Sequence, residues 1–328
     1  MARARALEIV RPGQSTYESV RHVYSSTGSP AAVLLPTSAA EVAQALEFAR
    51  SQPGPLAIRS GGHGISSIST NDGGTVIDLR RLNAIEHLGG KAVRVGPGAR
   101  WGGVARALYP WGLALTSGDS GDVGVGGLAT TGGLGLLGRS QGLTIDRMRA
   151  AELVTADGRM LRLAADEHPE VFWAVRGAGA NIGIVTAFEF EAKTTPTVAR
   201  ASVMYDVARP APFLEQWGAA VEAAPREVSA FLYVGGGARP FAQATIVYAG
   251  DEAASAARAL EPFVELPGVV GQRAELVPYP TVPLTSGAPH AGQQSAVMHG
   301  GLAGHIDRDL AQRLEVLLRS PGVDMVQM

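Results

Sequence analysis

The sequence predicts an α+β fold in two parts, with a domain boundary near Pro196. Its 328 residues suffice for about two domains. Residues 32–58 have the pattern of a strand–helix–strand unit. After Pro196, strand and helix candidates mix without strict alternation, which favours an antiparallel sheet with covering helices. We therefore expect one domain over residues 1–196 and a second over residues 197–328.

The strand–helix–strand unit has clear boundaries. Residues 32–35 form a short apolar run, and the segment from Ser38 to Glu41 has the sequence of a capping box. Apolar residues then recur at helical spacing as far as Ala49. Pro53 and Gly54 end the predicted helix, and residues 55–58 are the next strand. This strand leads directly into the sequence RSGGHG.

The remaining elements of the first part follow from apolar runs and turn residues. The dipeptide Asp157-Gly158 separates two apolar runs and favours a hairpin with a type I′ turn. Pro169 suits the first turn of a helix. The expected strands are residues 75–79, 92–95, 150–155, 160–163 and 181–191, and the expected helices are residues 100–109 and 168–176.

The second part contains three strand candidates and three helix candidates. A further apolar run, residues 323–326, resembles a strand in the middle of a sheet. The strands are expected at residues 199–207, 228–235 and 242–249, and the helices at residues 213–224, 252–264 and 307–318.

Composition excludes several classes of protein. The net charge is −2 and aromatic residues make up 6%, so neither a nucleic-acid surface nor attraction to anionic membranes is indicated. The absence of cysteine excludes disulfides, thiolate metal sites and cysteine nucleophiles. The N-terminus lacks the apolar region of a secretory signal, and no apolar run approaches the roughly 18 residues of a membrane helix. The expected location is the cytoplasm.

Glycine use is unusual and centres on two stretches. Of 42 glycines, many lie between Gly96 and Gly142, interleaved with apolar residues that a flexible linker would lack. In RSGGHG, Gly61 and Gly62 allow a positive φ and a close approach of the backbone to a ligand. Successive amide groups in such a turn form a concave site that suits phosphate oxygens. His63 lies inside this turn.

These motifs together resemble a known family. The chain is similar to the vanillyl-alcohol-oxidase-type FAD proteins, and most of all to their berberine-bridge-enzyme-like and 6-hydroxynicotine-oxidase-like branch. The resemblance covers about residues 30 to 195, which makes it far more specific than any one glycine motif. The matching motifs, in the family's order, are RSGGHG, VGVGGL, GGLG, GLTID and NIGIV.

The resemblance implies a PCMH-type FAD-binding domain made of two small α+β subdomains, followed by a substrate-binding domain. In the family, the histidine at the position of His63 bonds covalently to the flavin ring. A neutral imidazole is nucleophilic, which suits this bond. The residues expected to bind FAD are Arg59, Ser60, Gly61, Gly62, His63, Gly64, Ser120, Val123, Gly126, Gly127, Gly132, Gly133, Gly142, Ile145, Gly183 and Val185.

Three positions carry further expectations from the resemblance. Ser120 occupies the position at which many members have a second flavin-linking cysteine, so we expect attachment through His63 alone. Val123 matches a position where a small side chain leaves room for dioxygen, although it also suits a strand edge. Tyr279 resembles a recurring family tyrosine and is, with Val123, the catalytic candidate. The histidines of the second part are spaced too irregularly to indicate a metal.

The implied function is oxidation of a C–H bond next to oxygen or nitrogen, with hydride transfer to the covalent flavin and dioxygen as acceptor, which yields hydrogen peroxide. The expected partner is a small molecule: a sugar, an alkaloid or a secondary-metabolite alcohol. The alternatives are a dehydrogenase with another acceptor, or a flavin-binding fragment without turnover. The family continues into a tyrosine–asparagine segment that is absent here, so the chain resembles a member truncated at its C-terminus.

Two other enzyme classes fit less well. The sequence SGDSG from Ser117 resembles the nucleophile segment of trypsin-like proteases, but Asp122 follows where that motif has its final glycine, and the protease's histidine and cysteine context is absent. The run from Gly124 to Ala129 meets a dinucleotide-binding fingerprint only if alanine replaces its last glycine, and no clear strand precedes it.

Overall fold

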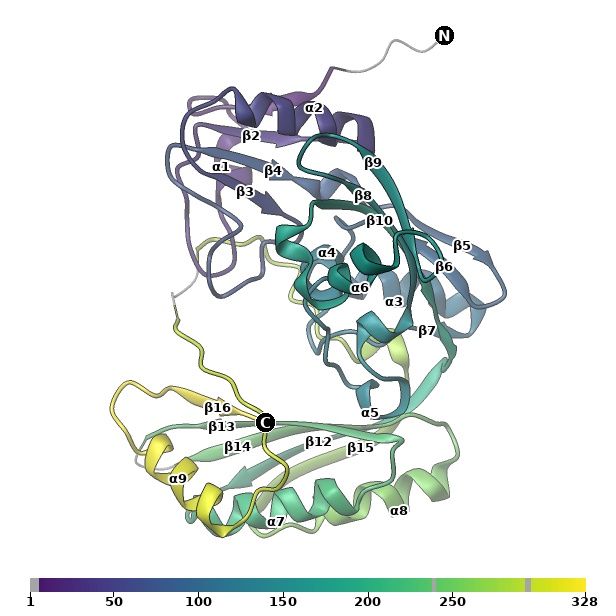
Figure 1. Cartoon of the computed structure of the whole chain (residues 1–328). Helices are drawn as coiled ribbons and strands as arrows, with labels where there is room; N and C mark the ends of the chain where they lie inside the picture. Colours follow the sequence, from purple (N-terminus) through teal and green to yellow (C-terminus); the bar gives the residue numbers. More distant parts are fainter. Residues whose placement is uncertain (1–5, 238–239, 293–295) are drawn as a thin grey trace. The chain divides into compact units, whose positions relative to one another are not determined.

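The computed structural model describes residues 6–237, 240–292 and 296–328, and it confirms the α+β class (Figure 1). The chain divides into two compact units. The first takes in Met1–Leu134, Leu143–Thr194 and Pro283–His299, and the second takes in Gly135–Gly142, Thr195–Val282 and Gly300–Met328. The predicted boundary lies close to the change of unit after Thr194. The two segments that join the other unit were not predicted, and the roles assigned to the two domains remain predictions.

The first sheet of unit 1 contains the predicted strand–helix–strand unit. Its strand order is β1 (Glu8–Val10), β2 (Ala32–Leu35), β4 (Thr75–Asp78) and β3 (Leu56–Arg59). β2, β4 and β3 are parallel, and β1 pairs with β2 in the antiparallel sense. A short helix, α1 (Tyr17–Arg21), follows β1. Because β3 ends at Arg59, the strand delivers the glycine loop to the end of this sheet.

Helix α2 (Ala39–Arg50) packs on the first sheet through Val42, Ala45 and Leu46. The Ser38 hydroxyl accepts a hydrogen bond from the Glu41 amide at 3.2 Å, which confirms half of the predicted capping box. The Glu41 carboxylate accepts hydrogen bonds from the amide and hydroxyl of Thr37 at 2.7 and 2.9 Å. The reciprocal bond is therefore made one residue earlier than in a standard capping box.

The second sheet of unit 1 is antiparallel throughout. Its order is β5 (Ile85–Gly89), β6 (Ala92–Val95), β10 (Ile184–Glu191), β8 (Met148–Val154) and β9 (Met160–Ala164). Helices α3 (Trp101–Leu108) and α6 (Pro169–Ala178) contribute Trp101, Phe172 and other buried residues to its core. The two sheets are the two α+β subdomains expected from the resemblance.

Two predictions for this sheet need correction. The hairpin between β8 and β9 is present, but Asp157 does not have a positive φ, whereas Gly158 has φ 87°. A type I′ turn needs a positive φ at both central residues, so the turn is of another kind. It spans residues 155–159, with the Thr155 amide bonded to the Arg159 carbonyl at 2.9 Å. The strand expected over residues 181–191 begins at Ile184, because a 3₁₀ turn precedes it.

Short elements connect the sheets of unit 1. A two-stranded ladder joins β7 (Leu113–Ala114) to β11 (Lys193–Thr194). Helix α4 (Val125–Ala129) lies in the glycine-dense stretch, and α5 (Gly138–Gln141) belongs to the segment that joins unit 2. The 3₁₀ turns of the first part are η1 (Leu79–Arg81), η2 (Tyr109–Trp111), η3 (Thr144–Arg147) and η4 (Gly179–Asn181).

Unit 2 is an antiparallel sheet with helices on one face (Figure 1). The order is β15 (Val269–Pro278), β12 (Thr197–Asp206), β14 (Phe241–Tyr248), β13 (Val228–Gly235) and β16 (Met325–Gln327). Helices α7 (Pro210–Ala223), α8 (Ala253–Val264) and α9 (Arg308–Leu318) cover it, and the turn η5 (Tyr279–Thr281) follows β15. This confirms the predicted antiparallel sheet with covering helices.

The core of unit 2 combines aliphatic side chains with the aromatic rings of Tyr205, Phe213, Trp217 and Phe263. The rings of Trp217 and Phe263 lie 5.3 Å apart, and the buried Tyr205 hydroxyl donates a hydrogen bond to the Phe263 carbonyl at 2.7 Å. The predicted strand at residues 323–326 is displaced to β16. Among the described residues β16 pairs only with β13, so it lies at an edge and not in the middle of the sheet.

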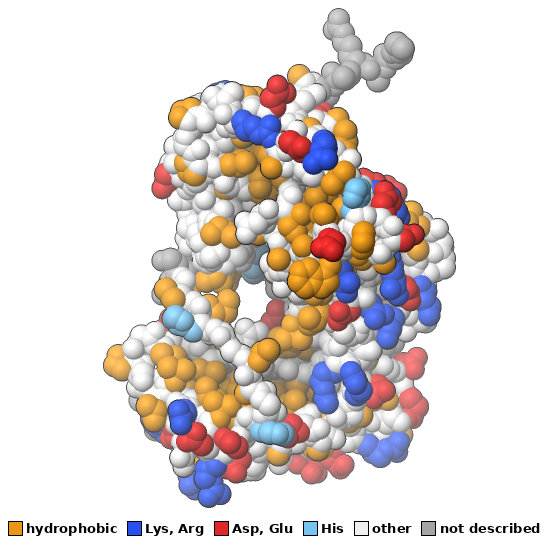
Figure 2. All heavy atoms as spheres, viewed as in Figure 1, with side chains coloured by type: hydrophobic (Ala, Val, Ile, Leu, Met, Phe, Trp, Pro, Cys, Tyr) orange, Lys and Arg blue, Asp and Glu red, His pale blue; other side chains and the backbone are white. Residues whose placement is uncertain are grey.

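The exposed surface carries charges of both signs. On the face shown in Figure 2, basic and acidic side chains are interspersed. Within residues 6–237, 240–292 and 296–328, no helix is both long and apolar enough to cross a membrane. The cytoplasmic location stays a prediction.

Candidate functional site

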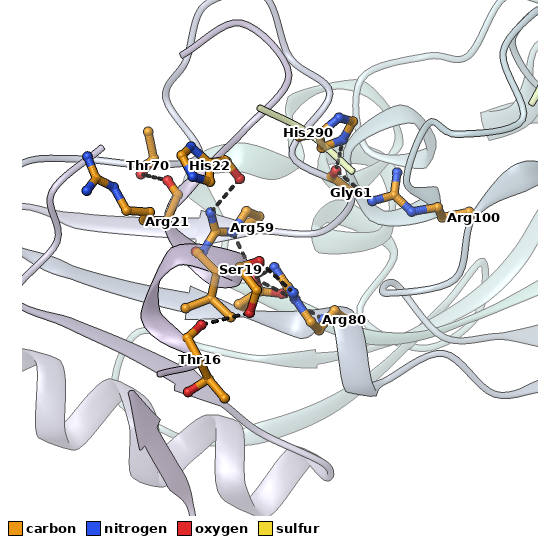
Figure 3. Close-up of polar contacts among 12 residues, drawn as sticks. Thr16, Ser19, Arg21, His22, Arg59, Gly61, Thr70, Arg80, Arg100 and His290 are labelled. Carbon is orange, nitrogen blue, oxygen red and sulfur yellow. Dashed lines mark hydrogen bonds and ion pairs between the residues drawn. The ribbon is translucent and has the colours of Figure 1, made fainter. Parts of the chain in front are cut away.

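The glycine loop begins at a buried ion pair. The Arg59 guanidinium lies 2.9 Å from the Asp78 carboxylate, and the two side chains are 2% and 0% exposed. Arg59 also donates to the carbonyls of Val20 and His22 at 2.5 and 3.4 Å (Figure 3). Because these partners lie inside the protein, Arg59 anchors the end of β3. Its predicted contact with FAD remains a prediction.

In the described part of the chain, the loop has two bonded carbonyls and three amides without an acceptor. The Gly62 carbonyl accepts from the Tyr24 amide at 2.8 Å, and the Gly64 carbonyl accepts from the Ser25 hydroxyl at 3.1 Å. The amides of Gly62, His63 and Gly64 donate no hydrogen bond to any residue that the structure describes. Gly62 has φ 65°, which favours glycine. Three successive amides without an acceptor among the described residues are what a phosphate-binding turn requires, and phosphate binding here stays a prediction.

Two glycines let the loop cross the glycine-dense stretch in direct backbone contact. A Cβ on Gly61 would lie 2.6 Å from the Cα of Gly124, and a Cβ on Gly124 would lie 2.6 Å from the Cα of Gly61. Ser60 reinforces this crossing, because its hydroxyl donates to the Pro97 carbonyl at 2.5 Å and accepts from the Gly126 amide at 3.1 Å. These glycines are therefore required by protein packing as well as by any ligand.

His63 lies in a small aromatic cluster. Its ring stacks on Tyr24, with centroids 4.3 Å apart and planes 15° apart, and the His290 ring meets it edge-on at 5.5 Å. Partial burial lowers the pKa of His63 below its usual 6.5, because the charged imidazolium loses hydration, and the nearby Arg100 cation lowers it further. His63 is therefore a neutral imidazole at pH 7.

The carbonyl of Gly61 is held by two cationic or potentially cationic side chains. His290 Nε2 donates to it at 3.0 Å and Arg100 donates at 3.3 Å, as Figure 3 shows. Arg100 also donates to the Asp122 carbonyl, and the Asp122 carboxylate accepts from the amide and hydroxyl of Ser286 at 2.7 and 2.8 Å. The loop is thus fixed from outside its own sequence.

Both His290 and Ser286 belong to the segment Pro283–His299, which returns to unit 1 after β15 and η5 of unit 2. Leu284 exchanges backbone hydrogen bonds with Asp119 and Gly121 at 3.0 and 2.6 Å. Sequence reasoning missed this support because the segment has no strong periodicity. It treated His290 as a surface or core residue, and only proximity in the fold shows its contact with the glycine loop.

The predicted glycines of the dense stretch divide into two groups. A Cβ on Gly127 or Gly132 would meet nothing within 4 Å, which leaves space beside the backbone. In contrast, a Cβ on Gly126 would lie 3.1 Å from the Ser60 Cβ, and one on Gly133 would lie 2.6 Å from the Thr144 Cβ. Ser120 accepts a hydrogen bond from the Asp122 amide at 3.3 Å. Gly127 and Gly132 are the better candidates for a surface that a ligand covers.

The other predicted FAD contacts have structural partners in the protein. A Cβ on Gly183 would lie 3.1 Å from the Leu153 side chain, and Val185 is buried in the core of the second sheet. Val123 packs at the margin of the same core. Ile145 is partly exposed and its carbonyl accepts from Arg176 at 3.0 Å. Gly142 ends α5 with φ 83° and belongs to unit 2.

Tyr279, the other catalytic candidate, lies in unit 2. It is 2% exposed, and its amide donates to the Pro196 carbonyl at 2.9 Å. No cluster of three or more potential metal ligands is found among the described residues.

These observations fit a dinucleotide. The amides of residues 62–64, which have no acceptor among the described residues, suit a diphosphate. Gly127 and Gly132 belong to the glycine-dense stretch and leave space beside their backbone. Thr116, in the same glycine-dense stretch, has a buried hydroxyl with no partner among the described residues. A buried polar group of this kind calls for a bound partner.

Comparison with known proteins gives the same answer. Residues 30–164 match the family described as FAD binding domain. The chain is 36% identical over 192 residues to (R)-6-hydroxynicotine oxidase from Paenarthrobacter nicotinovorans, covering 58% of this chain and 42% of that protein. It is 36% identical over 170 residues to chitooligosaccharide oxidase from Gibberella zeae, covering 51% of this chain and 35% of that protein.

Solved structures share the fold. 6-Hydroxy-D-nicotine oxidase from Arthrobacter nicotinovorans superposes with a TM-score of 0.79 at 29% identity, covering 86% of this chain and 64% of that one. A BBE-like protein from Physcomitrella patens superposes with a TM-score of 0.76 at 26% identity, covering 84% and 61%. The chain spans less than half the length of the two curated relatives named above.

Proposed function

Because this chain is a vanillyl-alcohol-oxidase-type FAD protein of the berberine-bridge-enzyme-like branch, we propose that it holds FAD at the glycine loop and oxidises a small molecule. The observation that carries the proposal is the run of free amides at Gly62, His63 and Gly64, with a neutral imidazole in its midst. FAD is the cofactor of this domain. The substrate, the acceptor and turnover by this chain are proposals.

The loop residues have distinct roles in this proposal. The amides of residues 62–64 donate to the diphosphate, where charge-assisted hydrogen bonds are strongest. The Arg59 side chain pairs with Asp78, so we propose that Arg59 contributes to FAD binding through the position of the strand end. It keeps the end of β3 in place, so the amides are oriented before the ligand arrives.

We propose that His63 forms the covalent bond to the flavin, and that it does so alone. Its pKa lies below the usual value, so the nucleophilic neutral form predominates at pH 7. Ser120 replaces the second attachment residue, and a hydroxyl is a far weaker nucleophile than a thiolate. The Ser120 hydroxyl accepts a hydrogen bond from the Asp122 amide, which supports a role of Ser120 in the geometry of this turn.

The experiment is an absorption spectrum of the purified protein before and after acid precipitation. Flavin absorbance that stays with the precipitate indicates a covalent bond. His63→Ala should release all flavin to the supernatant, while His87→Ala, a histidine of β5 that stacks on Trp111, should retain it. A protein that stays colourless when supplied with FAD contradicts the proposal, and covalent flavin in His63→Ala contradicts the role of His63.

When bound, FAD accepts a hydride from a C–H bond next to oxygen or nitrogen. The substrate proposed is a sugar, an alkaloid or a secondary-metabolite alcohol, in line with the relatives, which include hydroxynicotine and oligosaccharide oxidases. Dioxygen is the proposed final acceptor, with hydrogen peroxide as product. The alternatives are a dehydrogenase with another acceptor and flavin binding without turnover. Neither would form hydrogen peroxide with substrate, so detection of peroxide distinguishes an oxidase from both.

Two residues are proposed to act in turnover. Val123 is expected to leave dioxygen access, so Val123→Leu should slow reoxidation by air after anaerobic reduction.

Tyr279 is proposed to take the substrate's O–H or N–H proton. Tyr279→Phe should lower kcat while leaving FAD content unchanged, and an unchanged kcat would exclude that role.

A further inference from the structure

Two residues outside the glycine motifs contact the His63 ring. Tyr24 comes from the segment after α1, and His290 comes from the segment that returns to unit 1. We propose that Tyr24 and His290 are positioning residues that hold the His63 imidazole in one plane for bond formation with the flavin. This inference rests on the proposed attachment at His63 and adds the groups that direct it.

The geometry restrains the ring from two directions. Tyr24 covers one face of His63, with the planes 15° apart, and His290 lies at 73° to His63 and at 85° to Tyr24. A rotation of the His63 ring about its Cβ–Cγ bond would lose the stacking contact and would move an edge into His290. Aromatic contacts of this kind stabilise a ring's orientation beyond the effect of the area they bury.

His290 is itself fixed by a hydrogen bond that defines its tautomer. Its Nε2 lies 3.0 Å from the Gly61 carbonyl, which can only accept. The neutral ring therefore carries its proton on Nε2. Since Gly61 is two residues before His63, the same contact ties the position of His290 to the loop whose histidine it faces.

Burial and the positive charge of Arg100 favour neutral rings at both histidines. Burial lowers the pKa of His290 as it does that of His63, and Arg100 lowers both. The carboxylates of Asp119 and Asp122 act in the opposite direction on His63, but less strongly than burial. A neutral imidazole keeps a lone pair for attack.

The covalent step balances as follows. A nitrogen of His63 forms a bond to the methyl carbon on the flavin ring, and the imidazole N–H and one methyl C–H are lost. The two protons and two electrons pass to the ring system, which is thereby reduced. Dioxygen then takes up the two protons and two electrons and becomes hydrogen peroxide, which returns the linked flavin to its oxidised form. Tyr24 and His290 are unchanged by this step.

The test measures the rate of attachment in apoprotein of the full chain supplied with FAD. Fluorescence of the denatured protein reports the covalent fraction over time, and FAD titration of each variant reports noncovalent affinity. Tyr24→Leu and His290→Gln should slow attachment at saturating FAD by roughly tenfold or more, since a misplaced reacting group costs rate in this way. Their affinity for FAD should match the wild-type value, because the glutamine amide can still donate to the Gly61 carbonyl and Tyr24→Leu leaves that hydrogen bond in place. Tyr24→Phe keeps the stacked ring and should attach at the wild-type rate.

Each outcome decides one point. Wild-type rates in Tyr24→Leu and His290→Gln overturn the positioning role while the proposed attachment stands. A parallel loss of affinity and rate also overturns it, because the residues then support binding only. If the wild-type chain binds FAD but never links it, both the attachment and this inference fail.

Discussion

At the scale of single residues, the site depends on a buried charge pair and on two glycines. Asp78 accepts from Arg59 and, at 3.0 Å, from the amide and side chain of Arg80. Without Arg59, the buried Asp78 carboxylate would still be paired with the more exposed Arg80, at 2.8 Å. The sequence motif identified Arg59 but not its partner, since nothing in the local pattern links it to Asp78.

We predict that Arg59→Met lowers the free energy of unfolding by about 1.5–3 kcal/mol, because the buried Asp78 carboxylate would lose its hydrogen bond from Arg59 and keep those from Arg80. Urea denaturation of the apoprotein measures this. Arg81→Met is the matched control, since Arg81 forms a partly exposed pair with Glu8 at 2.7 Å, and it should cost no more than about 1 kcal/mol. Equal effects of the two variants would contradict the prediction.

A second prediction concerns the contact between Gly61 and Gly124. Gly124→Ala should displace the glycine loop and abolish FAD retention, because the new Cβ would collide with backbone that cannot move aside. Gly103→Ala is the control, since a Cβ there meets nothing within 4 Å and the position is inside α3. FAD content after gel filtration is the measurement. Retention of FAD by Gly124→Ala would show that the loop tolerates displacement.

At the scale of elements, local sequence explains some boundaries and not others. Helix α2 was predictable because Ser38 and the Pro53-Gly54 turn are local signals that its structure uses. Strand β15 was not predicted, because its outer residues include Gly271 and exposed polar side chains such as Gln272 and Arg273. It lies at a sheet edge and pairs only with β12 among the described residues. Few of its side chains are buried, so its sequence shows little alternation of apolar and polar residues.

The cap of α2 gives a prediction at this scale. Ser38→Ala should lower the free energy of unfolding by about 1 kcal/mol, because the Glu41 amide loses its acceptor. Ser66→Ala, an exposed loop serine, should change it by less than about 0.5 kcal/mol. Thermal melting followed by circular dichroism compares the two. A Ser38→Ala variant as stable as the control would mean that Glu41 and Thr37 suffice to cap the helix.

At the scale of the whole molecule, several residues that contact the glycine loop lie far from it in the sequence. The motifs predicted the glycine loop and its free amides, since glycine spacing is a local property. Tyr24, Arg100 and His290 were not predicted as partners of the loop, because their role depends on proximity in the fold. His290 stands 229 positions from the Gly61 carbonyl that it contacts, and no periodicity spans such a distance.

The burial of two histidines makes stability depend on pH. Both His63 and His290 have pKa values below 6.5 in the folded protein. Between these values and 6.5 the unfolded chain binds more protons, so the free energy of unfolding should fall as pH falls through this window and level off below it. Urea denaturation of the apoprotein between about pH 7.5 and 5 measures the slope. The double variant His63→Asn/His290→Asn should show a shallower slope, and an equal slope would assign it to other groups.

The long reach from Gly61 to His290 also sets an order of events during synthesis. Ribosomes add about 5–20 residues per second, so the 229 positions between these contacts correspond to roughly 10–50 seconds of translation. During that interval the glycine loop exists without the segment that steadies it. The proposed flavin site is therefore complete only after His290 has been synthesised, and cofactor capture is expected to follow that point.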